Sequence, residues 1–72
     1  MNLKDIFLDN GTRALLEANG EDDGLRGIDM CTGWHEVAEL CGFTNGRTPA
    51  REAYEDGWYR GAMKRNSNAR AS

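Results

Sequence analysis

The chain has 72 residues, of which 39% are hydrophobic and 29% are charged, and its formal net charge is −3. A chain of this length supports one domain, because so small a domain buries only about 60% of the surface that its unfolded chain exposes. No apolar run approaches the roughly 20 residues that span a bilayer, and the first ten residues do not resemble a secretory signal. We therefore expect one cytoplasmic domain without membrane contact, in which Cys31 and Cys41 are reduced thiols.

Charge is unevenly distributed along the chain. Residues 1–30 hold seven acids and three bases, a net of −4, whereas residues 31–72 hold five acids and six bases, a net of +1. The last nine residues hold three bases and no acid, so this end can approach phosphate groups while the acidic body repels them. A free-standing DNA-binding domain is usually clearly basic. The charge balance therefore disfavours tight binding to duplex DNA.

The first predicted element is helical. Apolar residues recur at helical spacing through residues 2–18, which predicts a helix there. The polar stretch 9–12 interrupts this pattern and predicts two short helices, with Asn10 or Thr12 as the cap of the second.

A loop is predicted to follow this first helical segment. Asn19 and Gly20 both tolerate the left-handed conformation at a helix end, so they predict its termination. Residues 20–29 contain three glycines and three acids before Asp29, which is typical of a solvated loop. We expect the next helix to be capped by Thr32 or Gly33 and to end before a turn.

The second half predicts a helical hairpin. Gly42 is expected at the end of the first helix of this pair. Thr48 predicts the cap of the second, with Pro49 in the first helical position, where its missing N–H costs nothing. This helix is expected to end near Lys64, and residues 66–72 are expected to form a disordered tail. The predicted fold class is all-α: a three- to four-helix domain over residues 1–65 with a basic tail.

The last predicted helix carries an unusual buried stripe. Gly57 and Gly61 lie four residues apart and therefore on one face, where they would admit another backbone or an aromatic ring, although a kink near Gly57 is the alternative. Trp58 and Tyr59 are neighbours and must point in different directions, so we expect Trp58 in the core and Tyr59 on the surface. The whole stripe comprises Ala50, Ala53, Tyr54, Gly57, Trp58 and Gly61.

The hairpin resembles the helix–turn–helix family. In that family a small residue of the first helix packs on the second, and a glycine four residues later makes the turn, as Ala38 and Gly42 do here. The flanking apolar set is Val37, Leu40, Cys41 and Phe43, with Thr44 following. The connection before Thr48 is longer than that family's, so an ordinary helical hairpin is the equal alternative to a helix that enters a major groove.

Catalytic and metal-binding patterns are lacking in the sequence. Cys31, His35, Glu39 and Cys41 offer ligand atoms, but the C-x-x-C element of structural zinc sites is missing. No nucleophile–base pair or phosphate-binding loop occurs. We therefore expect neither an enzyme nor a bound metal or cofactor.

Size, the acidic N-terminal part, the aromatic segment GWYRG and the basic C-terminus resemble the small phage transcription factors, known from a Xanthomonas phage, that bind host RNA polymerase. The resemblance implies docking near the RNA exit region, inhibition of initiation and antitermination. The polymerase is then the partner, with nascent RNA nearby. The residues expected to contact protein are Leu3, Ile6, Phe7, Trp34, Trp58, Tyr59 and Arg60. The residues expected near nucleic acid are Arg47, Arg51, Lys64, Arg65 and Arg70.

Two other functions stay open at this point. A helix–turn–helix repressor or excisionase-like protein would read bases in duplex DNA with Arg47 and Arg51, and would hold phosphates with Arg60, Lys64 and Arg65. An inhibitor of a host enzyme or defence complex would act by surface complementarity alone.

Overall fold

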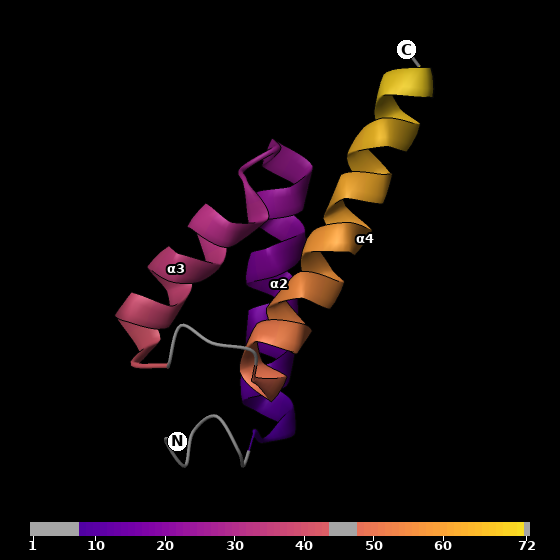
Figure 1. Ribbon diagram of the computed structural model, residues 1–72. Coiled ribbons are helices and arrows are strands. Elements are labelled where there is room, and N and C mark those ends of the chain that lie inside the picture. The colour runs from indigo at the N-terminus through magenta and orange to yellow at the C-terminus, as the bar shows by residue number, and fades with distance from the viewer. Residues whose placement is uncertain (1–7, 44–47, 72) are drawn as a thin grey trace.

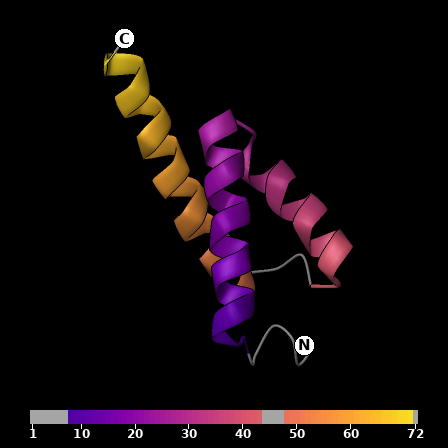
Figure 2. The same ribbon diagram turned by 180° about the vertical axis from the view of Figure 1, so that it is seen from behind.

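Three α-helices make up the part of the chain that the structure describes. The computed structural model describes the backbone of residues 8–43 and 48–71, and side chains up to Ser67. Within those residues the elements are α2 (Asn10–Arg26), α3 (Met30–Cys41) and α4 (Pro49–Ala71), with no strand. The predicted all-α class is confirmed. Figures 1 and 2 show α2 between the other two helices, with α4 running parallel to α2 and α3 running in the opposite direction.

Helix α2 is longer than the sequence predicts. The side chain of Asp9 caps its N-terminus by accepting a hydrogen bond from the backbone N–H of Thr12 (2.6 Å), and the helix then continues without a break to Arg26. Gly27 ends it in the left-handed conformation, with φ of 77°. The predicted break near residues 9–12 matches this start, although the cap is Asp9 and not Asn10 or Thr12, and the part of the prediction that precedes Leu8 lies outside the described residues. The predicted end at Asn19–Gly20 and most of the predicted loop at residues 20–29 are wrong.

Close packing of α2 on α4 explains this extension. Gly20 and Gly24 lie on the face of α2 that meets α4, and Gly57 and Gly61 lie on the face of α4 that meets α2. All four glycines are buried. A Cβ atom on Gly20 would lie 2.8 Å from the backbone nitrogen of Trp58, and one on Gly61 would lie 2.8 Å from that of Leu25. The two backbones therefore touch, as predicted for Gly57 and Gly61. Each glycine costs its helix about 1 kcal/mol, which this contact offsets.

Helix α3 begins earlier than predicted. Asp29, rather than Thr32 or Gly33, is its cap, and its carboxylate accepts from the backbone N–H of Thr32 (3.1 Å). A carboxylate accepts this bond more strongly than a hydroxyl does, which accounts for the earlier start. Gly42 ends the helix in the left-handed conformation (φ 78°), as the sequence predicts.

Helix α4 begins where predicted and ends later. The hydroxyl oxygen of Thr48 accepts from the backbone N–H of Arg51 (3.2 Å), and Pro49 takes the first position. The predicted end near Lys64 is wrong, since the helical backbone continues to Ala71 and residues 66–71 are its last turns. No glycine or proline follows Gly61, so nothing local stops the helix. Its C-terminal turns project past the end of α2 (Figure 1).

Aromatic rings join α3 to α4 in the core, to which α2 contributes Leu16 and a hydrogen-bond acceptor. The ring of Trp34 lies 6.0 Å from that of Phe43 and 5.7 Å from that of Tyr54, measured between centroids. The Tyr54 hydroxyl donates to a carboxylate oxygen of Asp23 on α2 (2.6 Å), and Gly33 leaves room for that hydroxyl. The buried hydrophobic residues are Leu16, Trp34, Ala38, Ala50, Ala53 and Tyr54.

Candidate protein-binding face

The aromatic residues predicted to contact a partner lie at different depths. Trp34 is fully buried, with 0% exposure, so its predicted role as a surface anchor is wrong. It lies on the inner face of α3, where its ring fills the space between the helices. Trp58 is half-buried and packs against the edge of the core, and Tyr59 is 55% exposed. The three apolar residues predicted near the N-terminus, Leu3, Ile6 and Phe7, lie outside the described residues.

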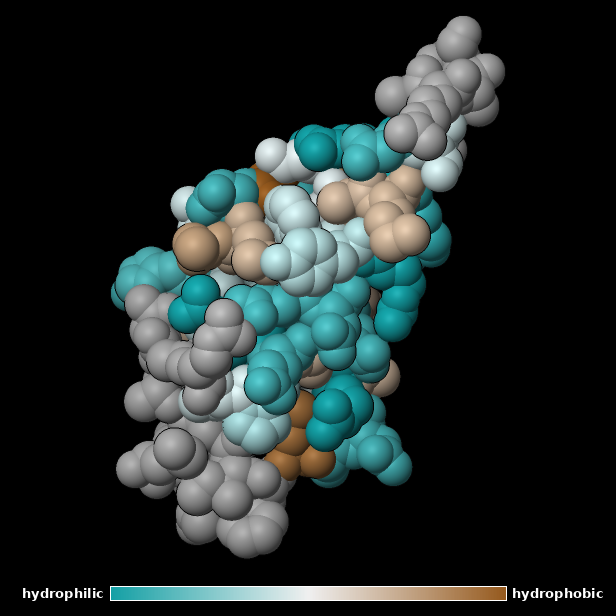
Figure 3. Space-filling model, turned by 45° about the vertical axis from the view of Figure 1, so that its right-hand side comes forward, coloured by the Kyte–Doolittle hydropathy of each residue, from teal (hydrophilic) through white to brown (hydrophobic). Residues whose placement is uncertain are grey.

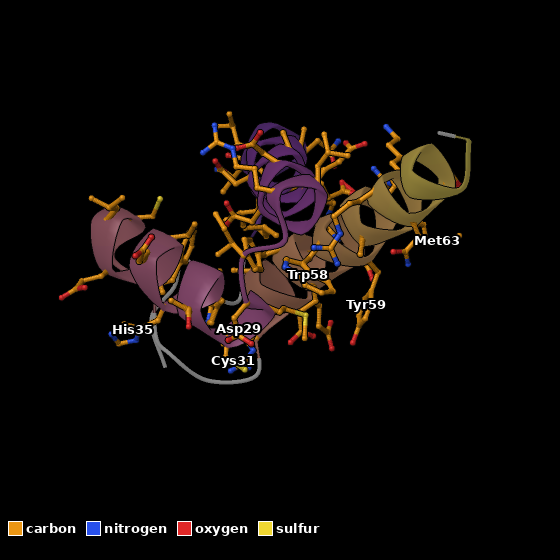
Figure 4. The ribbon with its side chains drawn as sticks, turned by 90° about the horizontal axis from the view of Figure 1, so that it is seen from above. Asp29, Cys31, His35, Trp58, Tyr59 and Met63 are labelled. Carbon is orange, nitrogen blue, oxygen red and sulfur yellow. The ribbon has the colours of Figure 1, made fainter. Side chains whose placement is uncertain are left out.

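Three side chains of α4 form the candidate face, called here the α4 strip: Trp58, Tyr59 and Met63. Tyr59 and Met63 are 55% and 70% exposed, and they lie one helical turn apart on the surface that points away from α2. Figure 4 shows the three side chains along the same side of α4. Met63 was not among the residues predicted from sequence, although its spacing of four from Tyr59 is the signal that could have found it.

The α4 strip is held in position before any partner binds. The indole N–H of Trp58 donates to the backbone carbonyl of Ile28 (2.8 Å), which fixes the ring against the α2–α3 connection. Tyr59 packs edge-on against this ring, with 5.6 Å between centroids and 90° between planes, an arrangement that aromatic pairs favour. Two of the three side chains have therefore already lost part of their conformational freedom, which lowers the cost of binding.

Most of the strip's surroundings are polar. Figure 3 shows a largely hydrophilic surface on which separate apolar areas lie in both the upper and the lower part of the view. Apolar anchors within a polar surround are typical of protein-binding sites that stay soluble when unoccupied.

Lys64, expected near nucleic acid, and Arg60, expected to contact protein, are both paired with acids of α2. Lys64 on α4 donates to Glu21 on α2, and this hydrogen bond is the main reason why the pKa of Glu21 is lowered. Arg60 lies 3.6 Å from the carboxylate of Glu17. These two ion pairs flank the glycine contact and join α2 to α4, so they add to the same interface.

The remaining basic residues differ in what the structure shows of them. Arg51 pairs with Glu55 one turn along α4 (3.1 Å). The guanidinium of Arg65 lies over Gly27, at the C-terminal end of α2, where a cation is favoured by the helix dipole. Arg47 and the side chain of Arg70 lie outside the described part of the chain.

A concave feature lies at the other end of the molecule from the α4 strip. A pocket of about 530 Å³ opens between the start of α2 and the end of α3. Leu15, 66% exposed, is on its rim. The lining residues are Leu8, Asp9, Thr12, Leu15, Leu16, Asn19, Cys41 and Phe43.

The described residues contain no cluster that could hold a metal ion and no helix that could cross a membrane. Within them, no three His, Cys, Asp or Glu side chains are grouped so as to hold a metal ion. Cys31 and Cys41 are both exposed and lie near opposite ends of α3. None of α2, α3 and α4 combines the length and the apolar character that crossing a membrane requires.

Comparison of the chain with protein families, with curated proteins and with solved structures finds no match. The choice of the candidate face therefore rests on the exposure and the contacts of its side chains.

Proposed function

We propose that this chain is a protein-binding module that docks through the α4 strip, and that its partner is host bacterial RNA polymerase. The observation that carries the docking proposal is the exposure of Tyr59 and Met63 beside a Trp58 ring that a hydrogen bond already holds. The polymerase assignment comes from the resemblance to small phage transcription factors. Its setting is the cytoplasm of the infected bacterium.

The chemistry of the strip favours a protein partner. Aromatic residues and methionine are enriched in protein interfaces, where a few of them carry most of the binding free energy. Tyr59 offers a large apolar ring with a hydroxyl that can reach a polar group at the rim. Met63 is unbranched and adapts to an irregular surface. A partner with a shallow apolar depression would bury both side chains together.

Binding near the RNA exit region would explain both proposed effects on transcription. A small body docked there would hinder initiation at host promoters and allow elongation to pass terminators. The last turns of α4 project beyond α2 (Figure 1), and Arg70 belongs to these turns. This end is the part of the chain that we assign to the neighbourhood of nascent RNA.

The ion pairs weigh against the helix–turn–helix alternative. The Gly42 turn and the Thr48 cap resemble that family, but Arg51 and Lys64, which would contact DNA, already face acids. Each such exposed pair is worth only about 0–1 kcal/mol, so a phosphate could displace it. The acid would then remain beside the phosphate and repel it. Few counterions would be released from the DNA, so the gain in affinity would be small. We expect no sub-micromolar duplex binding in gel-shift titrations at ~0.15 M salt.

The test is the affinity for purified bacterial RNA polymerase core and holoenzyme. We expect the chain to bind, and Tyr59→Ala to weaken binding by about 30-fold, the effect of a 2 kcal/mol hot spot. Met63→Ala should also weaken it. Leu15→Ala is the matched control, because it removes an equally exposed apolar side chain from α2. If the unchanged chain binds neither form of the polymerase, the proposed partner is wrong. Equal losses for Leu15→Ala and Tyr59→Ala would reject the strip.

A further inference from the structure

The outer face of α3 differs from the rest of the surface in its charge. Residues 29–43 contain three acids (Asp29, Glu36 and Glu39) and no lysine or arginine, a net of −3. The other residues contain nine acids and nine bases, a net of zero. The whole net charge of the chain therefore comes from α3 and its cap.

None of the ion pairs described above joins a cation of another helix to an acid of α3, although a guanidinium nitrogen of Arg51 lies 3.9 Å from the Sγ of Cys31 at the start of α3. Arg60 and Lys64 of α4 pair with acids of α2, and Arg51 pairs with an acid of its own helix. No lysine or arginine occurs anywhere in residues 27–46. The C-terminal end of a helix also carries a partial negative charge, and on α3 that end lies beside Glu39.

An exposed leucine lies among these acids. Leu40 is 88% exposed, the highest value among the exposed large hydrophobic residues. Glu36 precedes it by one turn and therefore neighbours it on the helix surface, and both Glu36 and Glu39 are exposed. The inner face of α3 is occupied by Gly33, Trp34 and Ala38. Figure 4 shows His35, from the outer side, pointing away from α2 and α4.

We infer that the outer face of α3 is a second docking surface, and that its occupant is a basic segment of another protein, with an apolar residue that covers Leu40 and lysines or arginines that face Glu36 and Glu39. Charge complementarity selects this occupant, because a net −3 surface repels nucleic acid and anionic lipid. The inference does not depend on the α4 strip, since α3 and α4 present different residues.

The experiment uses the full chain labelled with ¹⁵N and a synthetic amphipathic peptide of leucine and lysine as the probe. Its counterpart, with glutamate in place of lysine, is the charge control. We expect the lysine peptide to shift the amide signals of residues 36–41, and the glutamate peptide to shift none of them. The affinity should fall between 0.05 M and 0.3 M salt, because exposed charges are screened at higher ionic strength.

Variants separate this surface from general attraction between opposite charges. Glu36→Gln with Glu39→Gln should weaken binding between about twofold and thirtyfold, the effect of two exposed charge pairs, and Leu40→Ala should weaken it at unchanged charge. The matched controls are Glu52→Gln with Asp56→Gln, which remove two exposed acids from α4, and Leu15→Ala. All of these side chains are exposed, so circular dichroism should show unchanged folding.

Several results would overturn the inference. They are an absence of shifts on α3, equal weakening by the α4 control pair, and binding that Leu40→Ala leaves unchanged. Shifts of residues 36–41 that depend on the concentration of the chain alone would assign the face to a second copy instead, and would also overturn it.

Discussion

Replacing one of the four interhelical glycines by alanine should destabilise the protein, although alanine is the better helix former. A Cβ atom on Gly57 would lie 2.8 Å from the Cα atom of Glu17 and closer still to its carbonyl oxygen. Ordinary contact begins at 3.4 Å, so α2 and α4 must separate by at least about 0.6 Å. A gap of that size already forfeits about a quarter or more of each dispersion contact along the interface.

The expected magnitude follows from two opposing effects. Overpacking of a filled interface costs about 1–3 kcal/mol, and occasionally more, while exchanging glycine for alanine returns up to about 1 kcal/mol of helix propensity. Here the clashing atoms are backbone atoms that cannot rotate away, so the upper part of the range applies and the net loss is about 2 kcal/mol. A domain of this size has roughly 4–11 kcal/mol in total, and its melting temperature should fall by about 8–16 °C.

Gly11 supplies the control, on the same helix as Gly20. A Cβ atom there meets only the carboxylate of Asp9 at 3.6 Å, which is ordinary contact, so Gly11→Ala should be neutral or stabilising by up to about 1 kcal/mol. Urea unfolding followed by circular dichroism gives the free energy for each variant. If Gly20→Ala or Gly57→Ala proved as stable as Gly11→Ala, the close approach of α2 and α4 would be refuted.

Three further predictions concern hydrogen bonds of the fold. Tyr54→Phe should cost about 1.5–3 kcal/mol in urea unfolding, because it removes a bond to the charged carboxylate of Asp23; an unchanged midpoint would contradict that bond. Burial, and then the bond to Asp23, raise the pKa of Tyr54 far above its ordinary value. The contribution of neutral Tyr54 to the free energy of unfolding is therefore complete below about pH 10, where the tyrosine of the unfolded chain ionises. This contribution declines as the pH rises further. In a Tyr59→Phe variant, which leaves Tyr54 as the single tyrosine, absorbance at ~295 nm should then show ionisation only together with unfolding. Asp29→Ala should cost about 1 kcal/mol through loss of the α3 cap, whereas Thr32→Ala, which keeps the backbone N–H that Asp29 accepts, should cost less.

The sequence identified those features that depend on local chemistry. The Thr48–Pro49 start and the Gly42 turn follow from backbone preferences alone, and the structure has both. The spacing of Gly57 and Gly61 also indicated a close approach, because four residues bring side chains to one face of a helix. The fold class follows from the same signals.

The features that it missed depend on contacts between distant residues. The sequence around Gly20 predicts a helix end. A glycine that ends a helix and a glycine that lets a second helix pack closely have the same local sequence signal, and only the contact with α4 distinguishes them. Trp34 resembles an exposed anchor for the same reason, and only the packing of α3 shows that it is buried. The ion pairs of Lys64 and Arg60 also needed the pairing of α2 with α4, which no local pattern indicates.

The central claim is that Tyr59 lies in the contact with RNA polymerase, and site-specific photo-crosslinking tests it most directly. A benzophenone amino acid replaces Tyr59 in one variant and Leu15 in another, and each is irradiated with purified polymerase. The account predicts a crosslink to one polymerase subunit from position 59 and little from position 15, with competition by the unchanged chain. No crosslink from position 59, or equal crosslinking from both positions, would contradict it.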